Sequence, residues 1–460
     1  LQMEYNKELL FEKGQLVLDE AEKLGASQVE VTLQLTNLAL TRIANSIIDQ
    51  NVAERHAEIS TIVYYGKQQG SITVEVMDDD LIKEAVADAV KIAKISPENK
   101  DFKSLPKQKT YSDKLSLEDF ISEKTIEASP EQRADYAMKA VTTAEAIDDK
   151  IKAVAGVVSN HTIETAIMNS LGIEAYCPKT LSTINLTVLA EDNKEEAAGW
   201  SADRRKDFTE LKIEQVAKKA ARKAAEGFGM KVLDPGEYEV ILEPAAVGGF
   251  MFFMGYFGFS AMMYQDYMSF LRDKIGDKVF SEKLTLWDDA YDERLVINDL
   301  FDDEGVPKQK VELITNGVVK NLVYDTLTAD KDEVKTTGHN AKFRGRSIPV
   351  PTNLLMKEGD SSLDEMITET KNGLLVTHFH YQNSVNPQKG IMTGLTRDGA
   401  WYIKNGEIQH PVTTLRYTDA LPRFLSNIDL LGSYSELSDT PSKVPPIKLP
   451  SFSISGSSKE

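Results

Sequence analysis

The one close pair of histidines in the sequence is His378 and His380, which flank Phe379. Residues i and i+2 of a strand project from the same face of a sheet, so both imidazoles could point toward one site. Two ring nitrogens could bind a metal ion, but a zinc site needs at least a third protein ligand. The pair could equally supply polar contacts in a groove or serve a purely structural role, and the residues alone leave these readings open.

A second candidate is the carboxylate run Asp302-Asp303-Glu304, which precedes Gly305. Hard oxygen ligands suit calcium or magnesium, but the spacing does not match the twelve-residue loop of an EF-hand. Acidic residues before a glycine are typical of turns, so we expect a turn here rather than a metal site. The same reasoning applies to the other acidic runs, at residues 288–289 and 78–80.

Nucleophilic catalysis finds little support in the sequence. There is no Gly-x-Ser-x-Gly and no Walker loop, the signatures of a serine hydrolase and of a phosphate-binding loop. The one cysteine, Cys177, precedes Pro178, has no histidine near it in sequence, and is expected to be a small buried residue. A single thiol cannot form an intrachain disulfide, and nothing indicates an oxidising compartment.

Composition limits the classes of partner. The 460 residues carry a net charge of −19, which disfavours nucleic acid and anionic membranes as broad binding partners. No apolar run approaches the roughly 18 residues of a membrane span, and the first residues lack a signal pattern, so the cytoplasm is the expected location. The basic cluster Lys218, Lys219, Arg222 and Lys223 has helical spacing and is interpreted as a solvated helix face.

A chain of this length is expected to form two or three domains. The Asp-Pro-Gly sequence at 234–236 marks the strongest boundary. We therefore predict an α+β protein. An N-terminal α/β region over residues 1–229 has helices with mixed or antiparallel strands, with subregions of about 1–96 and 129–229 and a linker over 97–128. A β-rich C-terminal domain, with a helix packed on it, covers residues 230–460.

Periodicity and capping residues predict the individual elements. Helices are expected over residues 7–24, 81–95, 129–147, 206–227 and, as a helical segment, 244–275. Separate strands are expected over residues 29–33, 38–43, 57–65, 70–76, 153–159, 164–169 and 183–190. Asn316-Gly317 predicts a hairpin within 311–323, turns are expected at 398–399 and 405–406, and residues 448–454 could add an edge strand.

An ordered set of short strings resembles the TldD/TldE (PmbA) family, whose members were once described as modulators of DNA gyrase. Each string is weak alone, and the set is specific because its order and spacing extend over nearly the whole chain. The strings lie at residues 42–46, 168–172, 269–276, 278–285, 302–307, 352–353, 359–360, 394–399 and 405–408.

The resemblance implies a choice between two related types of chain. The TldD type carries a zinc-binding His-Glu-x-x-x-His on a helix and a cysteine near its C-terminus, whereas the TldE type lacks these ligands and pairs with TldD. Counted back from residue 269, the motif positions fall on Phe252, Phe253 and Phe257, and no cysteine follows Cys177. An aromatic ring cannot ligate zinc. We therefore expect neither a metal, nor another cofactor, nor catalytic residues at this helix.

By resemblance, this chain is expected to be a TldE/PmbA-like, metal-free subunit of a cytoplasmic peptidase that processes or degrades peptides. Its expected partner is a zinc-bearing TldD-like chain, although a homodimer is also possible. The chain is not expected to be active alone, and His378, His380, Arg397 and Asp398 are the candidates for a peptide groove. Two alternatives remain: an autonomous hydrolase using His378, His380 and a carboxylate, and a peptide-binding scaffold without a protease partner.

Overall fold

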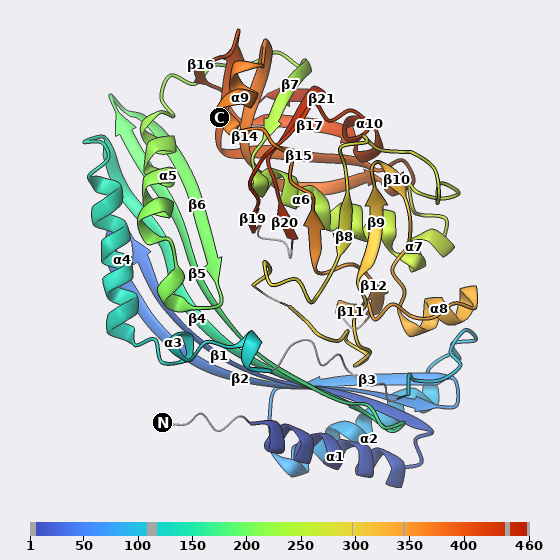
Figure 1. Cartoon of the computed structure of the whole chain (residues 1–460). Coiled ribbons are helices and arrows are strands. Elements are labelled where there is room, and N and C mark those ends of the chain that lie inside the picture. Colours follow the sequence, from blue (N-terminus) through green and yellow to red (C-terminus); the bar gives the residue numbers. More distant parts are fainter. Residues whose placement is uncertain (1–5, 108–116, 297, 344–345, 438–441, 458–460) are drawn as a thin grey trace.

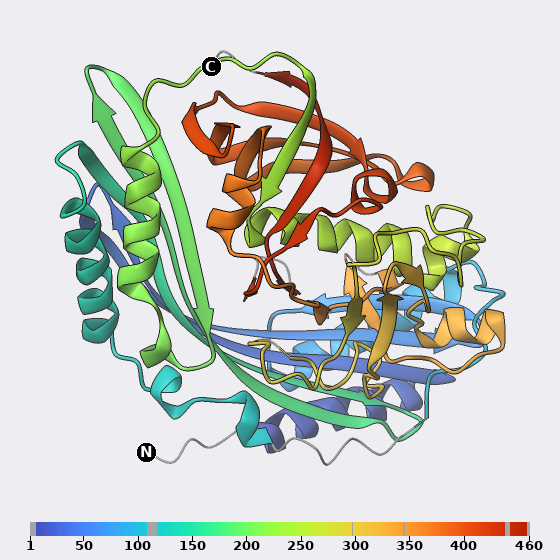
Figure 2. The same ribbon diagram turned by 45° about the horizontal axis from the view of Figure 1, so that its top comes forward.

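The computed structural model describes residues 6–107, 117–296, 298–343, 346–437 and 442–457. A long, curved sheet in the N-terminal half carries helices on its convex side, and the β-rich C-terminal half lies over its concave side (Figure 1). The second view shows the same arrangement (Figure 2). The predicted α+β class is confirmed.

The N-terminal sheet has six antiparallel strands in the order β3-β2-β1-β4-β5-β6. The bounds are Gln28–Ala44 for β1, Ile47–Tyr65 for β2, Gln68–Val74 for β3, Ile151–Asn169 for β4, Glu174–Asp192 for β5 and Glu195–Arg205 for β6. The breaks predicted within residues 29–43 and 153–169 are wrong, because β1 and β4 are continuous. Both have a partner on each side, so the ladder satisfies the backbone even where the side chains are polar.

Four helices cover the convex face in two pairs, each with its own apolar core (Figure 1). Helices α1 (Lys7–Lys23) and α2 (Asp79–Ile95) cover one end, and α4 (Pro130–Glu145) and α5 (Ile213–Ala225) cover the other. The predicted starts near 81 and 129 are confirmed, with Asp78 and Ser129 as caps. The predicted start at 206 is wrong, because Asp207 caps a separate 3-10 turn, Phe208–Glu210.

The predicted linker contains two short helical pieces, the 3-10 turn Leu117–Phe120 and α3 (Glu123–Ile126). Its residues 108–116 lie outside the described residues.

Five strands of the C-terminal half close into a barrel, in which β7, β21, β17, β15 and β14 pair in a ring. Residues 448–454 belong to an interior strand between β7 and β17, so the predicted edge strand is wrong in position. Asp398 and Gly399 lie within β15, with φ of 51° and 124°, and do not form the predicted turn between strands. The bounds are Gly236–Leu242 for β7, Asn372–Asn386 for β14, Ile391–Lys404 for β15, Leu415–Ala420 for β17 and Ile447–Ser457 for β21, with β16 (Glu407–Pro411) and β18 (Leu430–Leu431) attached outside the ring.

A second sheet lies beside the barrel, in the order β10-β9-β8-β13-β20-β19, and the predicted hairpin around Asn316-Gly317 is confirmed as β9–β10. The bounds are Val318–Val319 for β10, Val311–Thr315 for β9, Leu286–Asp288 for β8, Leu354–Met356 for β13, Ser442–Val444 for β20 and Glu436–Leu437 for β19. Apart from this sheet, β11 (Asn340–Phe343) pairs with β12 (Arg346–Pro349). The shorter helical pieces are α8 (Thr326–Asp332), α9 (Leu363–Thr368), α10 (Leu421–Leu425) and the 3-10 turn Pro387–Lys389.

Helix α6 (Pro244–Met254) lies in the core shared by the barrel and the second sheet, where Phe250 packs against Phe379, Phe424 and Phe452. A π-helical turn, Gly255–Phe259, and α7 (Ala261–Gln265) continue from it. The helical segment predicted to 275 therefore ends at 265. The following stretch contains Tyr267 and Asp273 in the left-handed region, with φ of 57° and 59°.

The two halves meet through a loop that we call the docking loop, residues 299–306. Its Phe301 and Val306 share an apolar cluster with Ile167 and Cys177 of the N-terminal sheet. Ion pairs between Lys179 and Asp299, Lys331 and Asp101, and Lys342 and Glu30 also cross this boundary. Within the described ranges, no helix combines the length and apolarity needed to cross a bilayer.

Candidate functional site

The four residues predicted to line a groove lie together on two paired barrel strands. His378 and His380 belong to β14, Arg397 and Asp398 belong to β15, and His378 stands opposite Arg397 in the register. Asp398 Oδ2 is 3.5 Å from His378 Nε2 and 3.6 Å from Arg397 Nε. Arg397 also approaches His380 Nε2 at 3.0 Å. The structure therefore brings all four side chains into one polar cluster.

The cluster faces the N-terminal half of the chain. The indole of Trp200 on β6 lies 4.7 Å from the His378 ring, measured between centroids. Burial lowers the pKa of His378 to about 4, helped by the positive charges of Lys223 and Arg397. Burial also raises the pKa of Asp398. His378 is therefore neutral at pH 7, and its approach to Asp398 is not an ion pair. Its Nδ1 atom is buried without a hydrogen-bond partner among the described residues.

Sequence reasoning missed an ionic cluster beside these residues, at the start of α6. Lys223 Nζ donates to Glu243 Oε1 at 2.7 Å and to Thr377 Oγ1 at 2.8 Å. Lys219 Nζ lies 3.0 Å from Glu243 Oε2. The prediction of a solvated helix face is thus wrong for Lys219 and Lys223, which turn one face of α5 toward the C-terminal domain. The i, i+4 spacing of Lys219 and Lys223 places both side chains on one face of a helix, and this spacing can be seen in the sequence. Their partner Glu243 could not be identified from the sequence.

The electrostatics of Lys223 follow from this position, because its side chain is 11% exposed and that of Glu243 is 5% exposed. Burial lowers the pKa of Lys223, and Glu243 opposes that effect. Burial alone would raise the pKa of Glu243, but Lys223 and Lys219 hold it below its usual value. Glu243 directly precedes α6, so this ionic cluster holds the start of that helix against α5 of the N-terminal half.

Helix α6 and the turn after it carry an aromatic ladder at the positions counted as zinc ligands. Phe252 is 50% exposed, whereas Phe253 and Phe257 are half-buried and lie nearly parallel, with centroids 6.3 Å apart. Zinc requires imidazole, thiolate or carboxylate donors, and none stands at these positions. Across the described ranges, no group of three histidine, cysteine or acidic residues is arranged to hold a metal ion. The residues present therefore do not fit a zinc ion at this helix.

Cys177 cannot supply a missing ligand at this helix. It lies on β5 of the N-terminal sheet, is buried, and belongs to the apolar cluster that receives the docking loop. Burial raises the pKa of its thiol to about 11, so the thiol stays protonated at neutral pH. The expectation of a small buried residue is confirmed.

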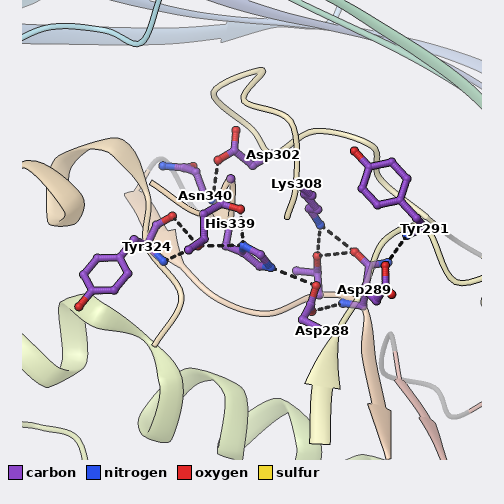
Figure 3. A network of polar contacts seen from close by, with 12 residues as sticks. Asp288, Asp289, Tyr291, Asp302, Lys308, Tyr324, His339 and Asn340 are labelled. Carbon is purple, nitrogen blue, oxygen red and sulfur yellow. Dashed lines mark hydrogen bonds and ion pairs between the residues drawn. The ribbon is translucent and has the colours of Figure 1, made fainter. Parts of the chain in front are cut away.

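The acidic runs of the C-terminal half hold loops in place (Figure 3). His339 Nε2 lies 3.0 Å from Asp288 Oδ1, and both side chains are fully buried. Asp302 Oδ1 accepts from the backbone N–H groups of Glu304 and Val306, as a turn requires, and its Oδ2 accepts from Asn340 N–H. The predicted acidic turn is confirmed.

Two family models and several known proteins match this chain. The model of the PmbA/TldA metallopeptidase C-terminal domain matches residues 235–456, and that of the central domain matches residues 123–227. A metalloprotease of Methanocaldococcus jannaschii is 26% identical over 397 residues, which is 83% of this chain and 84% of that protein. A metalloprotease PmbA homolog of Haemophilus influenzae is 25% identical over 416 residues, which is 89% of this chain and 88% of that protein.

Solved structures show the same fold. TldE from Thermococcus kodakarensis superposes with a TM-score of 0.87 at 22% identity, over 96% of this chain and all of that one. A Thermotoga maritima protein described as a candidate modulator of a DNA gyrase superposes with a TM-score of 0.83 at 22% identity, over 97% of this chain and all of that one. The matched domains and the shared fold together show that the chain belongs to the PmbA/TldD metallopeptidase family.

Proposed function

We propose that this chain is the TldE-type, metal-free subunit of a TldD/TldE-type peptidase that processes or degrades peptides. A TldD-like partner chain supplies the zinc site. The observation that carries the proposal is the set of aromatic side chains on α6 and the turn after it. By resemblance, Phe252, Phe253 and Phe257 occupy the positions of two histidines and a glutamate. Replacing the zinc ligands and the proton-carrying carboxylate removes both the metal and the acid–base group of a zinc peptidase.

The groove cluster gives this chain a role in such a complex. His378, His380, Arg397 and Asp398 provide donors and acceptors on one face of the barrel. Arg397 is half-exposed, and its guanidinium can donate to a peptide carbonyl or carboxylate. We infer that these side chains contact the peptide while the partner chain performs the cleavage.

The test is to purify the chain alone and together with a co-expressed TldD-like chain that has an intact His-Glu-x-x-x-His. The lone chain should contain no stoichiometric zinc and should not cleave an unstructured peptide. The pair should co-purify, contain zinc and cleave the peptide. About one zinc ion per lone chain, measured by elemental analysis, would contradict the proposal.

The His378–Asp398 approach supports one alternative, a hydrolase acting without a partner. A neutral imidazole beside a carboxylate is the arrangement of a general base. Under this alternative the lone chain cleaves the peptide, and His378→Asn abolishes the cleavage. The proposed role of a peptide-contacting groove predicts instead that Arg397→Ala raises KM in the complex and leaves kcat nearly unchanged.

A further inference from the structure

A cleft lies between the N-terminal and C-terminal halves of the chain and belongs to neither the groove cluster nor α6. Its volume is about 510 Å³, and both halves of the chain line it. Its walls combine aromatic rings, a flexible thioether and carboxylates. The lining residues that matter here are Tyr64, Phe102, Tyr256, Met262, Glu304 and Asp330.

The apolar walls suit an aliphatic chain. Tyr64 and Phe102 of the N-terminal half stack at 4.1 Å between centroids, with 6° between their planes. Tyr256, in the π-helical turn after α6, contributes a half-buried ring from the C-terminal half, and Met262 adds a side chain that adapts to an irregular ligand. Such walls can cover the methylene groups of a ligand while leaving its polar end free.

The polar end of the cleft is Glu304, in the docking loop. Its Oε2 accepts from the backbone N–H of Thr326 at 3.0 Å and from the hydroxyl of Thr326 at 2.7 Å. In the part of the chain that the structure describes, no lysine, arginine or histidine nitrogen forms an ion pair with this carboxylate. The side chain is half-buried and lines the cleft, so a ligand can reach it.

Several neighbouring groups are also acidic. Glu30, Asp302 and Asp325 act on Glu304 by charge, and burial together with these charges raises the pKa of Glu304 well above its usual value. The nearby Lys342 is bound to Glu30 at 2.9 Å. A further lysine at the cleft, Lys103, donates its Nζ proton to the backbone carbonyl of Asp330 at 2.8 Å. The Oε2 atom of Glu30 is itself buried without a hydrogen-bond partner among the described residues. The lining residues include three acidic side chains, Asp266, Glu304 and Asp330, and one lysine, Lys103, so acidic groups outnumber basic groups in the cleft.

We propose that this cleft binds a primary ammonium group on an aliphatic stem, with Glu304 as its counter-ion and the rings of Tyr64, Phe102 and Tyr256 around the stem. A lysine side chain of a peptide and a free diamine share this chemistry. An ammonium ion beside Glu304 favours the charged form of this carboxyl, whose pKa is raised in the free protein. Binding should therefore be accompanied by net proton release at pH values below that raised pKa. The inference does not depend on the proposed partnership with a TldD-like chain.

Calorimetry on the purified full chain tests the proposal with three probes. They are a blocked Gly-Ser-Lys-Ser-Gly peptide, the same peptide with norleucine in place of lysine, and 1,5-diaminopentane. The lysine peptide should bind, the norleucine peptide should bind at least about tenfold more weakly, and titrations in buffers of different ionisation enthalpy should show the proton release. Binding of the diamine as well identifies a site for free amines, and its failure to bind identifies a peptide site. Equal binding of the two peptides, or no binding of either amine, overturns the proposal.

Two variants test the assignment of residues. Glu304→Gln resembles the protonated carboxyl in shape, so it should fold, bind the lysine peptide at least about tenfold more weakly, and release no proton. Tyr256→Leu removes an aromatic wall and should weaken binding without abolishing the proton release. Glu12→Gln is the matched control, because Glu12 is 71% exposed on α1 and should leave binding unchanged. Wild-type affinity in Glu304→Gln, with unchanged thermal stability, would refute the role of Glu304.

Discussion

Substitution of Asp288 tests how the C-terminal domain is held together. One of its carboxylate oxygens lies 3.0 Å from His339 Nε2, and the other accepts from the backbone N–H of Asn353 at 2.6 Å. The second ring nitrogen of His339 lies 2.9 Å from the carbonyl oxygen of Thr337, which can only accept, so Nδ1 carries the proton. Asp288 therefore holds two separate loops against β8 (Figure 3).

Asp288→Ala and Asp288→Asn should lower the free energy of unfolding by different amounts. Asp288→Ala removes the buried acceptor that both His339 Nε2 and the Asn353 N–H contact, and each buried polar group that loses its hydrogen bond costs about 1–3 kcal/mol. Asp288→Asn keeps the shape. Its carbonyl can accept from the Asn353 N–H, and its amide can donate to His339 Nε2. The remaining loss is that of a charge-assisted hydrogen bond relative to a neutral one, about 1–2 kcal/mol.

Urea unfolding followed by tryptophan fluorescence measures both variants, since Trp287 adjoins the substituted residue on β8. The pH dependence supplies a second reading. Burial alone would raise the pKa of Asp288, but His339 and the other donors hold it below its usual value. The stabilisation by the carboxylate is thus complete above about pH 4 and is lost as the pH falls through the lower native pKa. Equal losses in the two variants, or a loss below about 1 kcal/mol in Asp288→Ala, would refute the reasoning.

Three further substitutions, one of them with a matched control, test the contact between the two halves and the groove. Lys223→Met leaves the buried carboxylate of Glu243 with one lysine partner, so it should lower the free energy of unfolding by about 3 kcal/mol. Lys218→Met is the control, because Lys218 lies on the same helix but is more exposed, and it should change the free energy of unfolding by less than about 0.5 kcal/mol. The native pKa of His378 lies below its unfolded value, so stability should fall by up to about 3 kcal/mol between pH 6.5 and pH 4, and His378→Asn should flatten this slope in denaturation curves. Gly305→Ala should lower the melting temperature, because Gly305 has a φ of 74° and an added Cβ would approach Ile173 to 2.5 Å; an unchanged melting temperature would show that the docking loop can shift at no cost.

Features fixed by neighbours in sequence could be predicted. The caps at Asp78 and Ser129 located two helix starts, and Asn316-Gly317 located a hairpin. The expectation that the aromatic residues counted as zinc positions cannot ligate the metal needs only residue identity, and it stays a prediction.

Features fixed by distant partners could not be predicted. Lys223 reads as a surface residue until Glu243, twenty positions later, is placed beside it. The polar residues in the middle of β1 indicated a break, but two flanking strands keep the backbone paired. Asp398 and Gly399 had the composition of a hairpin turn, yet they form an irregularity inside β15, between residues of that strand that pair with β14. In each case a long-range contact overrides a local preference.

The ring of strands in the C-terminal half imposes an order of events on synthesis. Strand β7 begins at residue 236, yet its partner β21 ends at residue 457. The N-terminal sheet and its helices can therefore form as they leave the ribosome, while the barrel must wait until more than two hundred further residues have emerged. Until then the aromatic side chains of α6 lack most of their packing partners, so nascent chains should depend on chaperones most strongly over this interval.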